Sequence, residues 1–206
     1  MNEVLSKAET VQHVWCSVAI TKKMEDVFIA FIVSQATKAA RIDEYIVYLS
    51  TLGGSAHSGM NLYNFMKSIP QRTTVYNMGN VHSAGVPFFL GFQRRFGVPD
   101  CSFMIHQTTF PRSILPEYFN VFDVETQQRS LLAIDKKSQE AILRETASRA
   151  TKPLSADVIA KAALDSTTYG ANEAHEHGFI EKIVSPKLPE SGVLYLTDQH
   201  LATLPG

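Results

Sequence analysis

Short hydrophobic runs alternate with helical patterns along the first half of the chain. Residues 11–20 are rich in β-branched and aromatic side chains, and residues 45–50 (Tyr-Ile-Val-Tyr-Leu-Ser) are almost continuously apolar. The second pattern is typical of a strand that a parallel sheet buries on both faces. Residues 24–40 contain neither glycine nor proline and are apolar nearly all round, which predicts a buried helix. Helical spacing predicts another helix over residues 58–69, which Pro70 ends.

The alternation continues to residue 106. We predict strands over residues 73–78 and 102–106, with a short apolar helix over residues 83–92 between them. A strand–helix–strand–helix–strand order implies right-handed crossovers between parallel strands. The chain is therefore expected to have an α/β fold built on a parallel sheet.

A long helix is predicted next. The segment from Pro116 to about residue 150 contains no glycine and no further proline, and its apolar positions step by three and seven residues. That spacing forms a narrow stripe along about nine turns. The stripe residues are Val121, Val124, Leu131, Ile134 and Ala141. Such a helix is expected to project beyond a compact domain and to pack on a partner chain or a neighbouring element. The alternative is two shorter helices folded back on each other.

Shorter elements are predicted after Pro153. Helices are expected over residues 156–164 and 171–177, and a closing strand over residues 179–184. The remaining tail is expected to be a surface arm in which residues 193–196 add an edge strand.

Composition narrows the class of protein. The 206 residues are 45% hydrophobic and 19% charged, with a net charge of −1. This amount of apolar material suits a packed domain and excludes a highly charged disordered chain. The balanced charge provides no global field that would favour nucleic acid.

The number of cysteines and the length of the apolar runs indicate in which compartment the protein is expected. Two cysteines, Cys16 and Cys101, are too few for a disulfide framework or a four-cysteine zinc site, and Cys16 is expected to be a small buried side chain. The longest apolar runs, residues 27–33 and 86–90, fall far short of the ~20 residues needed to span a bilayer. Residues 1–4 do not begin a signal peptide, so a cytoplasmic location is expected.

Three loops at predicted strand ends carry candidate chemistry. Gly53 and Gly54 follow a buried strand and would let the backbone approach a ligand closely. Ser83 lies between a strand and a helix, where free N–H groups and the helix dipole can stabilise an oxyanion. His106 ends another apolar strand, at the sheet edge where ligand sites collect. Each feature also has a purely structural interpretation when it is considered alone. The glycines would then form only a turn, Ser83 would cap the helix, and His106 would be a structural histidine.

Four blocks in this order resemble the ClpP family of self-compartmentalising serine peptidases, which has a ClpP/crotonase-type fold. Residues 52–55 (Leu-Gly-Gly-Ser) resemble the family's Pro-Gly-Gly-Ser, and residues 81–85 (Val-His-Ser-Ala-Gly) resemble the block that holds its nucleophile. Residues 104–107 (Met-Ile-His-Gln) match the block of its catalytic histidine, and residues 173–180 resemble the segment after its catalytic aspartate. The resemblance runs from about residue 14 to residue 184.

The resemblance implies a single domain over residues 1–206, with a repeated β-β-α superhelix around a parallel sheet core. A head is expected from about residues 10–107 and 151–184. A handle with the projecting long helix is expected over residues 108–150, and a C-terminal arm over residues 185–206.

The resemblance also implies a serine endopeptidase. Ser83 would attack a peptide carbonyl, His106 would take its proton, and the N–H groups of Gly54 and Ala84 would hold the oxyanion. Residues expected to bind the substrate are Gly53, Gln107 and Thr108. No metal and no organic cofactor is implied.

The acid of the triad is displaced in this sequence. Aligned on Glu173 and Ala174, the family's aspartate falls on Ser166, and Asp165 is its neighbour. A shift of one residue in that loop would bring Asp165 to His106, so we predict that Asp165 is the third member. The opposing interpretation makes Asp165 a solvated loop carboxylate or a helix cap.

The implied partners are other copies of the chain in a ring homo-oligomer, a tetradecamer in the family, and a polypeptide substrate. Neither nucleic acid nor a membrane is implied. An AAA+ unfoldase is a further partner of the family, but only about ten residues precede the first predicted strand, which argues against its docking.

Two departures from the family bear on assembly and on the site. Residues 108–116 contain two prolines and no glycine, which opposes a regular handle strand and predicts altered ring stacking. His82 precedes the nucleophile and is expected to be a packed structural histidine, with tuning of the site as the alternative.

Alternative functions remain open from the sequence. A catalytically weak or inactive subunit that assembles with an active relative would fit the displaced acid and the altered handle. A crotonase-type acyl-CoA enzyme would use the same Gly-Gly loop but generally carboxylates in place of Ser83 and His106. A Ser-Lys peptidase is disfavoured because no lysine occurs between Lys67 and Lys136.

Overall fold

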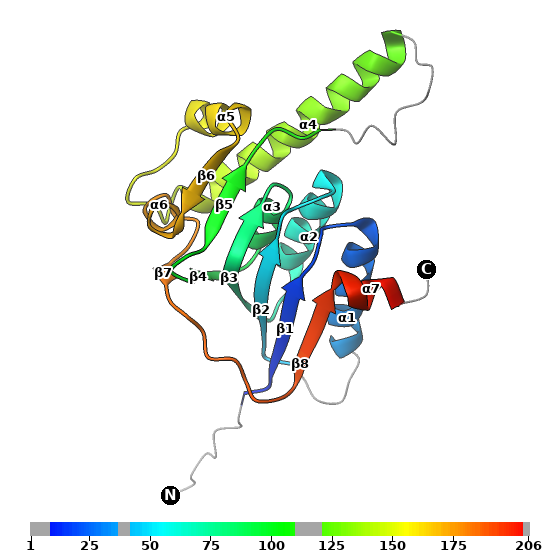
Figure 1. The fold of residues 1–206 in the computed structure, drawn as a ribbon, viewed down its shortest axis with the longest axis vertical. Helices are drawn as coiled ribbons and strands as arrows, with labels where there is room; N and C mark the ends of the chain where they lie inside the picture. The colour runs from blue at the N-terminus through cyan, green and yellow to red at the C-terminus, as the bar shows by residue number, and fades with distance from the viewer. Residues whose placement is uncertain (1–8, 37–41, 110–120, 204–206) are drawn as a thin grey trace, which may run out of the picture.

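The structure is a computed structural model that describes residues 9–36, 42–109 and 121–203. Its centre is an eight-stranded sheet with the order β6-β5-β3-β2-β1-β8, in which β4 pairs with β3 and β7 pairs with β4 (Figure 1). The strands are β1 (Val11–Ser17), β2 (Glu44–Thr51), β3 (Arg72–His82), β4 (Arg94–Gly97), β5 (Ser102–Ile105), β6 (Thr167–Gly170), β7 (Lys182–Ile183) and β8 (Val193–Thr197). The helices are α1 (Lys22–Ala36), α2 (Ala56–Ser68), α3 (Gly85–Leu90), α4 (Val121–Thr146), α5 (Ala156–Leu164), α6 (Ala171–Glu176) and α7 (Asp198–Thr203).

Parallel pairing dominates the sheet. The central strands β1, β2 and β3 place Val14, Val47 and Val75 in register, and all three side chains are fully buried. Helices α1, α2 and α3 pack on one side of these strands (Figure 1). Strand β6 runs antiparallel to β5. The predicted α/β fold with a parallel sheet core is confirmed.

Aromatic side chains fill the core beneath the carboxyl ends of β3 and β5. Phe103 is fully buried, and its ring lies 5.0 Å from that of Phe89 in an edge-to-face arrangement. Phe179 closes the other side of Phe103 at 5.4 Å. Each such ring pair contributes ~0.5–1.5 kcal/mol to stability beyond the burial of its apolar area. The cluster therefore stabilises the core next to the ends of β3 and β5.

The long helix α4 is continuous over Val121–Thr146 and projects from the head (Figure 1). This continuity excludes two folded-back helices over that range. Ile134 and Ala141 of the predicted stripe are buried against α2, whereas Val124 is exposed. The predicted start of the helix, and residues 110–116 of the handle segment, lie outside the described residues.

Strand β4 and helix α7 were not expected from the sequence. The pair Arg94-Arg95 at the start of β4 resembles a charged loop, but Arg95 is fully buried. Its Nη2 donates hydrogen bonds to the carbonyl oxygens of Glu145 (2.7 Å) and Gly178 (3.4 Å). The closing strand predicted over residues 179–184 is only Lys182–Ile183 in the structure. Strand β6 forms over residues for which no helix or strand was predicted.

Two smaller expectations have clear outcomes. Cys16 is fully buried, as predicted. Strand β8 pairs with β1 at the sheet edge, which confirms the edge strand predicted over residues 193–196. No helix in the described ranges is long and apolar enough to cross a membrane.

Candidate active site

Ser83 lies at a sharp corner between β3 and α3. Its φ is 55°, in the left-handed region that residues other than glycine seldom occupy. The corner is held from both sides, because the Ser83 N–H donates to the Met104 carbonyl (2.8 Å) and the Ser83 carbonyl accepts from the Val86 N–H (2.9 Å). Helix α3 has Ala84 as its N-cap and no side-chain cap bond. The Ser83 hydroxyl is therefore not used as a helix cap.

The Gly53-Gly54 loop packs directly against this corner. Gly53 has φ 95°, and a Cβ built on it would lie 2.6 Å from the Ser83 Cβ and 2.7 Å from the His82 carbonyl oxygen. Hydrogen bonds from the Ile20 N–H to Gly53 O (2.8 Å) and from Ser55 N–H to Ile20 O (2.7 Å) fix the loop. Only glycine allows the backbone to come this close to Ser83.

Two backbone N–H groups at this contact are available to a ligand. Among residues 9–36, 42–109 and 121–203, neither the Gly54 N–H nor the Ala84 N–H donates a hydrogen bond. The Ala84 nitrogen is 3.2 Å from the position of a Cβ on Gly53, so the two peptide segments are in contact. Unpaired donors beside a hydroxyl are what an oxyanion requires.

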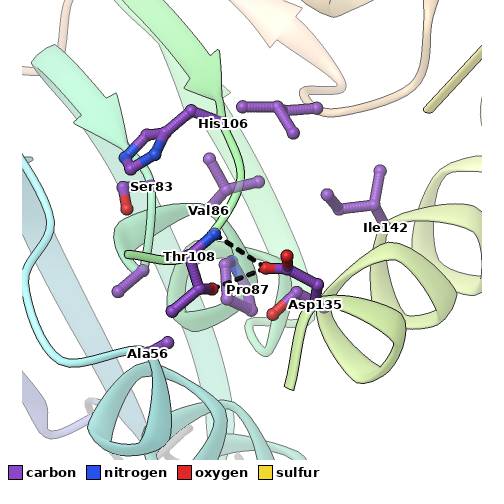
Figure 2. Close-up of a pocket in the computed structure, with 11 residues that line it drawn as sticks. Ala56, Ser83, Val86, Pro87, His106, Thr108, Asp135 and Ile142 are labelled. Carbon is purple, nitrogen blue, oxygen red and sulfur yellow. Dashed lines mark hydrogen bonds between the residues drawn. The ribbon is translucent and has the colours of Figure 1, made fainter. Parts of the chain in front are cut away.

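His106 follows β5 and lines the same pocket as Ser83. Figure 2 shows its imidazole beside the Ser83 hydroxyl. The Nδ1 atom lies 2.6 Å from the Gln107 carbonyl oxygen, which can only accept, so Nδ1 carries the hydrogen in this bond. The neutral imidazole then presents Nε2 as a proton acceptor.

Two cavities meet at this point. The smaller is about 30 Å³ and lies between α3, α4 and the end of β5. The larger is about 560 Å³ and lies along the Gly53-Gly54 loop, where Gly54, Ser55 and Ile20 line it. Both are lined by Ala56 and Thr108, so the two cavities are neighbours, and Ser83 lines the smaller one. An extended chain could lie along the larger cavity with one side chain in the smaller one.

The predicted acid lies elsewhere in this structure. Asp165 is the C-cap of α5, and its exposed carboxylate forms an ion pair with Lys161. Ser166 has φ 55° and directly precedes Thr167, which is paired with Ile105. The antiparallel ladder ends at this pair, so Ser166 and His106 are the next residues beyond it on the two chain segments. The assignment of Asp165 to the triad stays a prediction, and it requires the carboxylate to leave Lys161.

Of the predicted substrate-binding residues, Thr108 lines both cavities, whereas Gly53 packs against Ser83 and lines neither of them. The backbone N–H of Gln107 donates to the Ala163 carbonyl (3.0 Å), which ties the end of β5 to α5. Thr108 is held by Asp135 of α4, whose Oδ1 accepts from the Thr108 N–H (2.9 Å) and from its hydroxyl (2.6 Å) (Figure 2). Asp135 was not among the site residues predicted from the sequence.

His82 is a partly buried structural histidine beside the site. The Ser102 hydroxyl donates to Asn80 Oδ1 (3.0 Å), so its oxygen accepts from His82 Nε2 at 2.9 Å. Burial lowers the pKa of His82, and the neighbouring charge of His106 lowers it further. In the described part of the chain, no three His, Cys, Asp or Glu side chains gather so that they could hold a metal ion.

Comparison with known proteins identifies relatives. A family model described as Clp protease matches residues 1–187. The "ATP-dependent Clp protease proteolytic subunit 3" of Rhizobium johnstonii is 26% identical over 152 residues, which cover 73% of each chain. The protein of the same name from Rhodococcus jostii is 24% identical over 174 residues, 82% of this chain and 81% of that one. A solved structure of a ClpP1 mutant from Listeria monocytogenes has the same fold, with a TM-score of 0.67 at 18% identity over 87% of this chain and 92% of that chain.

Proposed function

The chain belongs to the Clp protease family, and we propose that it is a serine endopeptidase that cleaves unfolded or small polypeptides inside a ring-shaped chamber. One observation carries the proposal. The Ser83 hydroxyl sits on a strained corner in one pocket with His106, beside two unpaired backbone N–H groups. This combination supplies a nucleophile, a base and an oxyanion site.

The first half of the reaction forms an acyl-enzyme. Ser83 Oγ attacks the substrate carbonyl while its proton passes to His106 Nε2, which the Nδ1–H bond to the Gln107 carbonyl leaves as the acceptor. The carbonyl oxygen becomes an oxyanion that accepts from the N–H groups of Gly54 and Ala84. Each such donor contributes about 10²–10³ in rate. The imidazolium then gives the proton to the leaving amine as the C–N bond breaks.

The second half releases the acyl group. Water replaces the departed amine, His106 takes its proton, and the hydroxyl oxygen attacks the ester carbonyl. The same two N–H groups hold the second oxyanion. Collapse of that intermediate breaks the bond to Ser83 Oγ, which recovers its proton from His106.

We further propose that Asp165 completes the triad. Ser166 and His106 directly adjoin the last pair of the β5–β6 ladder, so a rearrangement of this loop would exchange Lys161 for His106 as the partner of Asp165. A carboxylate would hold the imidazolium more strongly than the neutral Gln107 carbonyl does. In Ser-His-Asp enzymes, replacement of the acid lowers kcat about 10⁴-fold.

A second candidate function is a weakly active subunit that assembles with an active relative. The observation that favours it is the same ion pair, since an Asp165 that stays with Lys161 leaves His106 without an acid. Both candidates place the chain in a ring of like subunits. We propose a homo-oligomeric ring of the family's tetradecameric type, in the cytoplasm. An unfoldase partner is not required for small polypeptides.

Labelling with a fluorophosphonate probe separates the two candidates. The probe is applied to protein whose native mass shows assembly, and the labelled residue is mapped by tryptic digestion. Ser83 lies in a single tryptic peptide, residues 73–94. The endopeptidase predicts rapid labelling of that peptide, loss of label in Ser83→Ala, and slow labelling in His106→Gln. An assembled, folded protein that takes no label at Ser83 would exclude the endopeptidase and favour the weakly active subunit.

A further inference from the structure

One carboxylate enters the pocket beside the nucleophile. Among the described residues that line the smaller cavity, Asp135 is the only acid. It is partly buried and lies on α4 three and seven positions before Ser138 and Ile142, which also line the cavity. This spacing sets the three side chains on one face of the helix, toward Ser83.

Asp135 has no cationic partner in the described part of the chain. Its neighbour Lys136 pairs with Glu140 on the outer face of α4. Within residues 9–36, 42–109 and 121–203, the polar contacts of Asp135 are the two bonds from Thr108, and both end on Oδ1. A carboxylate has about four acceptor positions on two oxygens, so Oδ2 remains able to accept. An acid in this state is suited to a positively charged ligand group.

The rest of the pocket limits the shape of that group. Apolar side chains of Val86, Pro87 and Ile142 line the cavity, whose volume is about 30 Å³. A slim unbranched stem fits such a passage better than a branched or aromatic side chain does. Lysine combines that stem with a terminal charge and commonly buries the stem while the ammonium reaches a polar partner.

We propose that the smaller cavity binds the P1 side chain, the one that precedes the cleaved bond, and that Asp135 makes lysine the preferred P1 residue. The inference rests on the proposed endopeptidase function and names its substrate class. Arginine is a weaker ligand, because its two-pronged contact needs both carboxylate oxygens and Thr108 already occupies Oδ1. Glutamate at P1 is rejected by charge repulsion.

Paired fluorogenic peptides test the preference directly. They differ only at P1, which is lysine, its uncharged counterpart norleucine, arginine or glutamate. Hydrogen bonds to charged groups of this kind correspond to about 10- to 100-fold in kcat/KM. We expect kcat/KM for the lysine peptide to exceed that for the norleucine peptide by at least tenfold, and Asp135→Asn to lower this ratio to about one. Asparagine keeps an acceptor for Thr108, so the variant removes the charge and preserves the local structure.

Glu140→Gln is the matched control, since it removes one acidic charge from the exposed side of the same helix. It should leave the ratio of lysine to norleucine unchanged. A native ratio near one, or a ratio that Asp135→Asn does not lower, would overturn the inference.

A binding measurement separates this inference from the proposed reaction. Calorimetry with Ser83→Ala protein compares the lysine and norleucine peptides without any turnover. Tighter binding of the lysine peptide that disappears in Ser83→Ala/Asp135→Asn supports the pocket even where native protein fails to react. Equal binding of the two peptides would refute the pocket even where Ser83 reacts with the fluorophosphonate.

Discussion

Replacement of Gly53 by alanine would add one methyl group where the Gly53-Gly54 loop meets Ser83. The new Cβ would lie 2.6 Å from the Ser83 Cβ, whereas ordinary contact begins at 3.4 Å. The two segments must therefore separate by about 0.8 Å, the difference between these distances. The residue would also hold a φ near 95°, which strains alanine by about 1–3 kcal/mol.

The expected result is a large loss of reactivity with a moderate loss of stability. Displacements of about 1 Å in a reacting group cost ~10²-fold, equivalent to about 2.7 kcal/mol in the barrier. We therefore expect the fluorophosphonate labelling rate of Ser83 in Gly53→Ala to fall about 100-fold. The free energy of unfolding, measured with urea, should fall by about 1–3 kcal/mol.

Alanine variants of two other glycines distinguish the effect of backbone strain from the effect of the steric clash with Ser83. Gly192 has φ 78° and no atom within 4 Å of its added Cβ, so Gly192→Ala carries the strain alone. Gly79 has an ordinary φ and its nearest contact is 3.7 Å away, so Gly79→Ala carries neither. Both variants should label at the native rate. Labelling of Gly53→Ala at that rate, in folded protein, would show that the loop does not position Ser83.

Three further predictions concern the acid, a histidine and the thiols. Lys161→Ala should raise the labelling rate of Ser83 by releasing Asp165, and Asp165→Ala should lower it at least tenfold; no effect of either would exclude Asp165 from the triad. The pKa of His82 is lowered below its ordinary 6.5, so the unfolded chain binds this proton more readily and stability is lost as the pH falls through 6.5. Urea unfolding should therefore show a smaller loss between pH 7.5 and pH 5 in His82→Gln than in native protein, and equal losses would contradict this linkage. Burial raises the pKa of Cys16 to about 12 and that of Cys101 to about 11, so thiol reagents at pH 8 should modify both in urea and neither in the fold.

Local patterns were sufficient to predict the strands that build the site. Residues 45–50 form an almost continuously apolar run, and such a run identifies a strand without any partner being known. Ser83 and His106 could be placed together because both follow strands that end at one edge of a parallel sheet. The structure brings them into one pocket.

Features that depend on distant partners could not be predicted. Arg95 is buried through carbonyl groups of residues 50 and 83 positions away, which no local pattern reveals. Asp135 meets Thr108 from 27 positions away, across a segment whose path the sequence does not specify. Its spacing with Ser138 and Ile142 was the available signal, but hydrophobic periodicity does not mark an acid that faces a pocket.

The surroundings of Asp165 also depend on distant partners and could not be predicted. Strand β6 has only four residues, Thr-Thr-Tyr-Gly, and its antiparallel pairing with β5 joins segments more than sixty positions apart. The resemblance to the family predicts the acid only to within one residue, at Asp165 beside Ser166. Which of Lys161 and His106 the carboxylate binds depends on loop geometry at the end of that ladder.

The pairing of β1 with both β2 and β8 has a consequence for synthesis of the chain. Strand β8 leaves the ribosome roughly 180 residues after β1. Translation at about 5–20 residues per second makes this delay on the order of 9–36 seconds. Throughout that interval one edge of β1 is uncovered and open to pairing with other nascent chains. Strand β6 likewise emerges more than sixty residues after β5, so the loop that follows His106 in space is completed well after His106 itself has been synthesised.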